Sequence, residues 1–179
     1  MGSQGLSRFE ELISTVSRYQ TLAAENYTRV RSLAEELRAG LCAHIGMKDG
    51  VCVQLVPPTG QFEPRDYGDQ AFSIPPQGFR PLGAIQFGLA IRVLGEKDWM
   101  RVTMQCQKIG DEFIAQIVGG EEYRLNIPLQ ENDPEPFYDH IYEHVLEWFQ
   151  TQIERYEAGD YGSREIGFDL SRDIDEVVA

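Results

Sequence analysis

The clearest feature of the sequence is an alternation of apolar and polar residues from Ala84 to Ile127. Successive side chains of a strand point to opposite faces, so a repeat of two predicts strands that each bury one face. Gly110-Asp111 and Gly119-Gly120 separate the later strands, and connections this short join antiparallel neighbours. The alternation therefore predicts an antiparallel β-meander, to which a short strand near residues 51–56 adds at one edge.

A helical repeat precedes the meander and predicts a long helix over residues 6–43. With Phe9 as position a of a heptad, apolar residues occupy almost every a and d position as far as Leu37. Ser7 followed by Glu10 fits a capping box, in which each side chain bonds the backbone of the other residue. At a rise of 1.5 Å per residue the helix is about 55 Å long, which exceeds the width of a small sheet.

Two arrangements are compatible with so long a helix. In the first, the helix lies across the meander and covers it, either whole or broken near Ala23–Asn26 into two shorter helices. In the second, the a and d positions pair with a second copy of the chain, and the polar Asn26 sets the register of that homodimer. The sequence leaves both arrangements open.

A second helix is predicted over residues 134–158. Asp133 before Pro134 fits a helix start, and Gly159 fits a helix stop. The apolar residues form a band that is wide enough to be buried on two sides. This band comprises Phe137, Tyr138, Ile141, Tyr142, Val145, Leu146, Trp148, Phe149, Ile153 and Tyr156.

These elements together predict a single α+β domain over residues 1–179, within the size range of one domain. An antiparallel sheet of five or six strands occupies residues 51–127 and is flanked by the long N-terminal helix and the C-terminal helix. Residues 159–179 form an acidic tail, with at most a short helix at Ser171–Val178.

The net charge of −13 is concentrated in the C-terminal part of the chain. Residues 1–109 hold 12 Lys or Arg and 11 Asp or Glu, whereas residues 110–179 hold 4 and 18. Affinity for nucleic acids and for anionic membranes comes from Lys and Arg, so this distribution argues against both as partners. A protein partner with a basic surface suits the charge, although acidic surfaces also serve solubility alone.

The cysteines and the lack of an apolar span bear on the compartment. Cys42, Cys52 and Cys106 are odd in number and lack a Cys-x-x-Cys spacing, so we expect reduced, structural thiols. No run approaches the roughly 18 apolar residues that span a bilayer, and Met1–Leu12 lacks the layout of a signal peptide. A cytoplasmic protein is the resulting prediction.

A proline-rich loop over residues 57–83 interrupts the strand pattern and holds six of the nine prolines. A short strand at Gln70–Ile74 reduces its irregular part. Aromatic residues recur along the loop, and buried rings would pin it onto the core: they are Phe62, Tyr67, Phe72 and Phe79. In a second interpretation the loop is a lid over a small ligand, and its polar contacts come from Arg65, Asp66, Tyr67 and Asp69.

One string in the predicted second helix has the form of a catalytic motif. His140-Ile141-Tyr142-Glu143-His144 resembles the His-x-x-Glu-His motif of the inverzincin metallopeptidases. The resemblance covers these five residues and implies zinc bound by His140 and His144, with Glu143 as the general base. That family takes a further acidic ligand from another helix. Here the acidic residues that follow lie on the same helix or just after it, namely Glu147, Glu154, Glu157 and Asp160.

The polar face of the meander is rich in amide and guanidinium groups. Such groups hydrogen-bond protein partners, although one face of an antiparallel sheet is also commonly left in water. The residues that we expect to bind a partner are Arg92, Arg101, Gln105, Gln107 and Arg124.

These observations predict a non-catalytic, cytoplasmic protein-interaction module without a cofactor, of the kind used as a chaperone, adaptor or immunity protein. One alternative is a zinc-dependent hydrolase that uses His140, Glu143 and His144. The other is a small-ligand sensor with the proline-rich loop as its lid.

Overall fold

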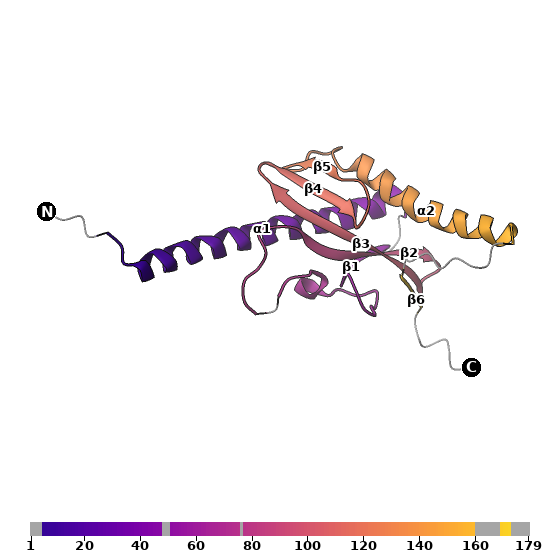
Figure 1. Cartoon of the computed structure of the whole chain (residues 1–179). Helices are drawn as coiled ribbons and strands as arrows, with labels where there is room; N and C mark the ends of the chain where they lie inside the picture. The colour runs from indigo at the N-terminus through magenta and orange to yellow at the C-terminus, as the bar shows by residue number, and fades with distance from the viewer. Residues whose placement is uncertain (1–4, 48–50, 76, 160–168, 173–179) are drawn as a thin grey trace.

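The computed structural model describes residues 5–47, 51–75, 77–159 and 169–172. It has the predicted α+β architecture, in which an antiparallel sheet is flanked by a long N-terminal helix and a C-terminal helix (Figure 1). The helices are α1 (Arg8–Ile45), the 3-10 helix η1 (Gly68–Ala71) and α2 (Glu135–Glu157). The strands are β1 (Val53–Val56), β2 (Ile85–Leu94), β3 (Asp98–Ile109), β4 (Glu112–Ile117), β5 (Tyr123–Asn126) and β6 (Asp169–Arg172).

The predicted meander is confirmed. The sheet has the order β1-β2-β3-β4-β5, and each strand pairs antiparallel with the next along the chain. The alternation fixes the register, because Phe87 pairs with Met104 and these apolar side chains are buried together. β6 is a sixth strand that pairs antiparallel with the first residues of β3.

Two predicted details of secondary structure are wrong. The expected strand at Gln70–Ile74 is replaced by η1 and by a single bridge between Phe72 and Phe87, because the Gln70 amide donates to the Tyr67 carbonyl and closes a turn. Ser171 lies in β6 and not in a short helix, since it pairs with β3. The rest of that predicted helix lies outside the described residues.

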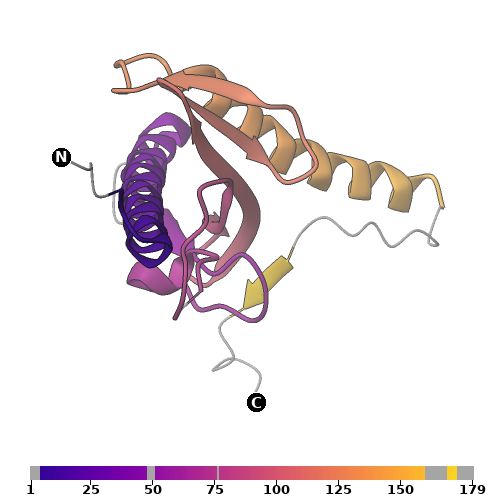
Figure 2. The ribbon, with the colours of Figure 1, turned by 60° about the vertical axis from the view of Figure 1, so that its left-hand side comes forward.

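The core lies where the sheet curves around the C-terminal half of α1 (Figure 2). Leu37 and Leu41 of α1 and Phe87 and Leu89 of β2 have no exposed surface. Each large apolar side chain buried in this way stabilises the fold by about 1.5–3 kcal/mol. The contact therefore fixes the direction in which the rest of α1 leaves the sheet.

α1 is continuous from Arg8 to Ile45, so the break that one arrangement allowed near Ala23–Asn26 does not occur. Asn26 is buried, and its side-chain amide donates to the carbonyls of Pro81 and Gly83 at 3.1 and 3.0 Å. The polar residue at this heptad position therefore holds the end of the proline-rich loop against an unbroken helix.

α2 packs with its first turns against the C-terminal end of α1. Tyr138 of α2 lies over Gly40 of α1, and its hydroxyl donates to the Glu36 carbonyl at 3.3 Å. Burial raises the pKa of Tyr138 to about 12. A Cβ at position 40 would lie 2.6 Å from Cζ of the tyrosine ring, so glycine is what allows the helices to approach this closely.

Gly40→Ala is expected to lower the free energy of unfolding by about 1–3 kcal/mol, the usual cost of overpacking. Helix propensity alone predicts a gain of about 1 kcal/mol, so the sign distinguishes the two effects. Urea unfolding followed by circular dichroism measures the change. In a Tyr138→Leu background the same substitution is expected to cost less, and a stabilised Gly40→Ala single variant would show that the close contact is wrong.

Candidate functional site

The N-terminal half of α1 extends beyond the sheet (Figure 1). The buried residues of α1 begin at Ala23, whereas Phe9, Leu12 and Ile13 are 68%, 59% and 49% exposed. These residues continue the same heptad face that the sheet covers further along the helix. We call this surface the apolar stripe. It is made of Leu6 just before α1 and of Phe9, Leu12, Ile13, Val16, Tyr19 and Leu22 on the helix, where Val16 and Tyr19 are partly exposed.

The stripe ends at the proline-rich loop. Tyr19 meets Phe79 edge to face at a ring-centroid distance of 5.7 Å, and its hydroxyl donates to the Arg80 carbonyl at 2.9 Å. Phe79 and Leu82 are themselves 57% and 44% exposed. The loop therefore extends the apolar surface sideways at the point where the sheet begins to cover α1.

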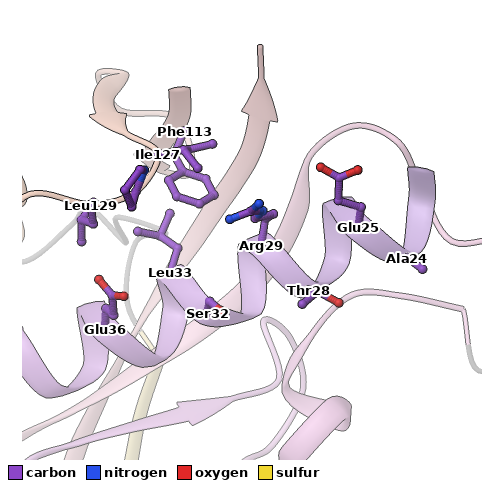
Figure 3. Close-up of a pocket in the computed structure, with 11 residues that line it drawn as sticks. Ala24, Glu25, Thr28, Arg29, Ser32, Leu33, Glu36, Phe113, Ile127 and Leu129 are labelled. Atoms are coloured by element: carbon purple, nitrogen blue, oxygen red, sulfur yellow. The ribbon is translucent and has the colours of Figure 1, made fainter. Parts of the chain in front are cut away.

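A groove of about 550 Å³ lies on another face of α1, against Phe113 of β4 and the residues after β5 (Figure 3). Leu33, Phe113 and Leu129 form apolar walls, and Arg29 stands along the helix between Glu25 and Glu36. The sequence did not predict this groove, because its walls come from segments that meet only in the fold.

The predicted recognition face is partly covered. Arg101 is only 3% exposed, and it donates to the Pro57 carbonyl at 3.0 Å. Its guanidinium lies over the ring of Phe62 at 4.9 Å, and the Thr103 hydroxyl donates to the Pro58 carbonyl at 3.1 Å. Arg101 thus holds the start of the proline-rich loop against the sheet.

The sequence did contain a sign of this contact. Gly88 lies inside β2, and a Cβ there would be 2.8 Å from Cδ of Arg101 and 2.9 Å from the Pro57 carbonyl. A glycine within a strand often marks a close approach of another segment.

The other residues of the predicted face are more accessible. Gln86 donates to Gln105 at 3.3 Å, and Gln105 and Gln107 are both partly exposed. Arg124 is exposed and pairs with Glu112 at 2.8 Å. Arg92 lies near the end of β2, and its guanidinium is turned to the Met47 sulfur, to which it donates at 2.6 Å. The five predicted residues therefore do not form one site.

The predicted ligand residues of the loop bond mainly to the chain itself. Arg65 stacks over the Tyr67 ring at 3.8 Å, and Asp66 accepts from the Gly68 amide at 2.9 Å. Asp69 accepts from Tyr27 and Arg31 of α1. Burial, and then the bond to Asp69, raises the pKa of Tyr27 to about 12.

Buried rings hold much of the loop, as one interpretation of the sequence expects. Phe62 and Phe72 are 7% and 5% exposed and Tyr67 is half-buried, whereas Phe79 packs against Tyr19.

His140 and His144 lie on one face of α2 with ring centroids 6.3 Å apart. The His140 ring packs on Tyr123 at 4.9 Å, and Glu143 is exposed. Burial, and then the neighbouring His140, lowers the pKa of His144. Within the described residues, no three His, Cys, Asp or Glu side chains gather in a way that would hold a metal ion.

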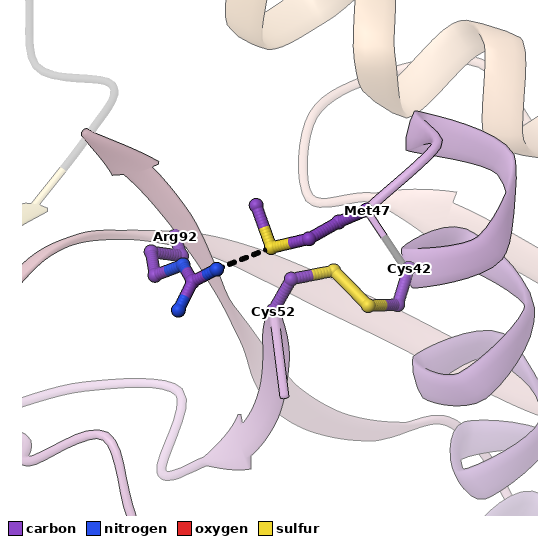
Figure 4. The surroundings of a disulfide bond; sticks show 4 residues. All are labelled: Cys42, Met47, Cys52 and Arg92. Atoms are coloured by element: carbon purple, nitrogen blue, oxygen red, sulfur yellow. Dashed lines mark hydrogen bonds between the residues drawn. A yellow bond between two sulfur atoms is a disulfide. The ribbon is translucent and has the colours of Figure 1, made fainter. Parts of the chain in front are cut away.

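The prediction of reduced thiols is wrong for two of the cysteines. Cys42 near the end of α1 and Cys52 just before β1 form a disulfide, with Met47 and Arg92 beside it (Figure 4). The Cα atoms are 5.6 Å apart, because the end of α1 packs against the start of β1. Cys106 is a free thiol, and its complete burial raises its pKa.

Comparison of the chain with protein families, with curated proteins and with solved structures finds no match. Among the helices of the described residues, none combines the length and the apolar character needed to cross a membrane. The function must therefore be inferred from the geometry of the chain.

Proposed function

We propose that the chain is a non-catalytic protein-interaction module that binds its partner through the apolar stripe. The observation that carries this proposal is the exposed half of α1. Seven large apolar side chains there and on the adjoining loop are 41–70% exposed: Leu6, Phe9, Leu12, Ile13, Leu22, Phe79 and Leu82.

The area of this surface supports binding. Aromatic side chains have about 150–250 Å² of surface and those of leucine and isoleucine somewhat less, so the seven at these exposed fractions together expose on the order of 700 Å². The largest apolar patch of a typical soluble monomer is about 300–600 Å², and patches above that range usually mark interaction sites. A helix that projects with its apolar face open matches the helix-in-groove and helix-pairing modes of recognition.

The compartment and the charge of the partner are parts of the same proposal. A cytoplasmic location suits an adaptor or chaperone, whereas the Cys42–Cys52 disulfide favours an oxidising compartment, since disulfides are rare in the cytosol. A basic partner suits the acidic C-terminal part of the chain. The stripe itself is flanked by both signs of charge, Arg8 and Arg18 with Glu10 and Glu11, so its selectivity rests on apolar contact.

Affinity capture with matched baits tests the proposed function. Tagged wild-type protein is expected to recover a stoichiometric partner from the native cell, an untagged copy of the chain included. Leu12→Glu, which places a charge in the stripe, is expected to lose that partner, while Ser14→Glu on the opposite, exposed face keeps it. Recovery that is equal for all three baits, or no stoichiometric protein with any of them, would contradict the proposal.

A further inference from the structure

We infer that the partner of the apolar stripe is the stripe of a second copy of this chain, packed antiparallel. This inference rests on the proposed function and names the partner of the same surface. The sequence left open whether α1 pairs with a copy or covers the sheet. In the structure the C-terminal half of α1 covers the sheet, and the N-terminal half is free to pair.

The heptad positions favour a copy over a charged partner. The outer positions of this half are polar, occupied by Glu10, Glu11, Ser14, Ser17, Arg18 and Thr21. From residue 13 onward the positions that flank the a and d seam are uncharged, occupied by Ile13, Thr15, Gln20 and Leu22. Arg8, at the first flanking position, is a single charge that two antiparallel copies place at opposite ends of the pair. Charges at the flanking positions normally select a different partner or orientation. Two identical helices can therefore pair along this seam without like charges facing each other at the flanking positions.

The sheet decides the orientation. α1 is straight and unbroken to Ile45, and its own sheet covers the heptad face from Ala23 onward. In a parallel pair the second helix would run in the same direction and enter the space of that sheet. In an antiparallel pair the second helix ends there instead, because its N-terminal tip points toward the body of the first copy.

The register follows from matching a positions to d positions. Phe9 then lies opposite Tyr19 of the second copy, and Leu12 lies opposite Val16 of the second copy. The numbers of two residues that lie opposite each other add up to 28. The N-cap Ser7 of one copy is therefore level with Thr21 of the other, two residues before Ala23, where the sheet begins to bury α1. Phe9 of one copy therefore arrives beside Phe79 of the other, which contacts Tyr19.

Charge agrees with this register, and the area is sufficient. Glu10 of one copy is level with Arg18 of the other, whereas a parallel pair would place like charges level. Both lie on the outer face, so this contribution is small.

The roughly 700 Å² exposed on each copy is close to the about 800 Å² per partner of a standard interface. Both copies use the same surface in this contact, so the assembly ends at two copies, as expected for a homodimer with two-fold symmetry.

Sedimentation and light scattering of the purified full chain test the second copy. The wild type and Ser14→Glu are expected to have twice the monomer mass of 20.4 kDa. Leu12→Glu is expected to raise the Kd at least about thirtyfold, the effect of losing a central apolar contact, with an unchanged circular dichroism spectrum. A wild type that is monomeric at about 100 µM, or a dimer that Leu12→Glu leaves intact, overturns the inference. A monomer whose stripe still captures a different protein leaves the proposed function standing.

Disulfide cross-linking tests the orientation. A mixture of Leu12→Cys and Val16→Cys chains is expected to form the mixed dimer covalently, because positions 12 and 16 face each other in the antiparallel pair. Leu12→Cys alone is expected to cross-link at least tenfold more slowly. Faster cross-linking of Leu12→Cys with itself than in the mixture indicates a parallel pair and overturns the antiparallel arrangement.

Discussion

Replacing Arg101 with alanine is expected to lower the free energy of unfolding by about 3 kcal/mol and to expose the loop 57–67 to proteases. The guanidinium of Arg101 is buried and bonds the Pro57 carbonyl, so its loss removes a charge-assisted hydrogen bond and leaves that carbonyl without this donor. The contact with the Phe62 ring is lost as well. Urea unfolding gives the stability, and the rate of tryptic cleavage after Arg65 reports on the loop.

Arg124→Ala is the matched control. Arg124 also lies on the predicted recognition face, but it is exposed, and its pair with Glu112 is partly solvated, with side chains 68% and 43% exposed. Exposed pairs contribute about 0–1 kcal/mol, so this variant is expected to unfold almost like the wild type and to keep the loop protected. Equal losses in the two variants would show that Arg101 does not hold the loop.

The contrast between these arginines shows how far the sequence predicts the site. Alternation places Arg101 and Arg124 on the same polar face, and the pairing of the strands confirms the register on which that rests. Whether a polar face stays open depends on what folds over it. The carbonyls of Pro57 and Pro58 reach β3 from 44 and 45 residues away along the chain, and no local pattern reports such a contact.

The same reason explains the long helix. Its capping box and heptad spacing are local, so the start and the continuity of the apolar face were predictable, and the bonds between Ser7 and Glu10 confirm the start. The extent of the sheet along α1 is a property of the whole fold. It leaves Phe9 and Leu12 exposed and buries Leu33 and Leu37, although all four belong to one repeat.

The sequence does not predict the pairing of the cysteines, because an odd number of cysteines without a motif says little about which of them are oxidised. Cys42 and Cys52 are separated by ten positions in sequence, and the packing of α1 against β1 brings them together. Their disulfide links α1 covalently to the residue before β1, near the end of α1 that also packs against α2. The other half of α1 has no such support and is free to meet a partner.

Reducing the Cys42–Cys52 disulfide is expected to lower the free energy of unfolding by about 2–3 kcal/mol, because the bond closes a short loop in the unfolded chain. The two cysteines are 10 positions apart in sequence, and so short a loop places the stabilisation near the lower end of the roughly 2–4 kcal/mol that is typical of disulfides. The measurement is urea unfolding of the wild type with and without a phosphine reductant. Cys42→Ala is expected to unfold like the reduced wild type and to show no further change with reductant.

Cys106→Ala separates the disulfide from the third cysteine. Cys106 is a buried free thiol, so its variant is expected to keep the full response to reductant. Thiol titration of the unfolded, unreduced wild type is expected to count one of the three cysteines, and all three after reduction. Three free thiols in protein taken from its native compartment would contradict the disulfide and favour the cytoplasm. One free thiol would place the chain where disulfides persist, and the partner of the apolar stripe would then be sought in that oxidising compartment.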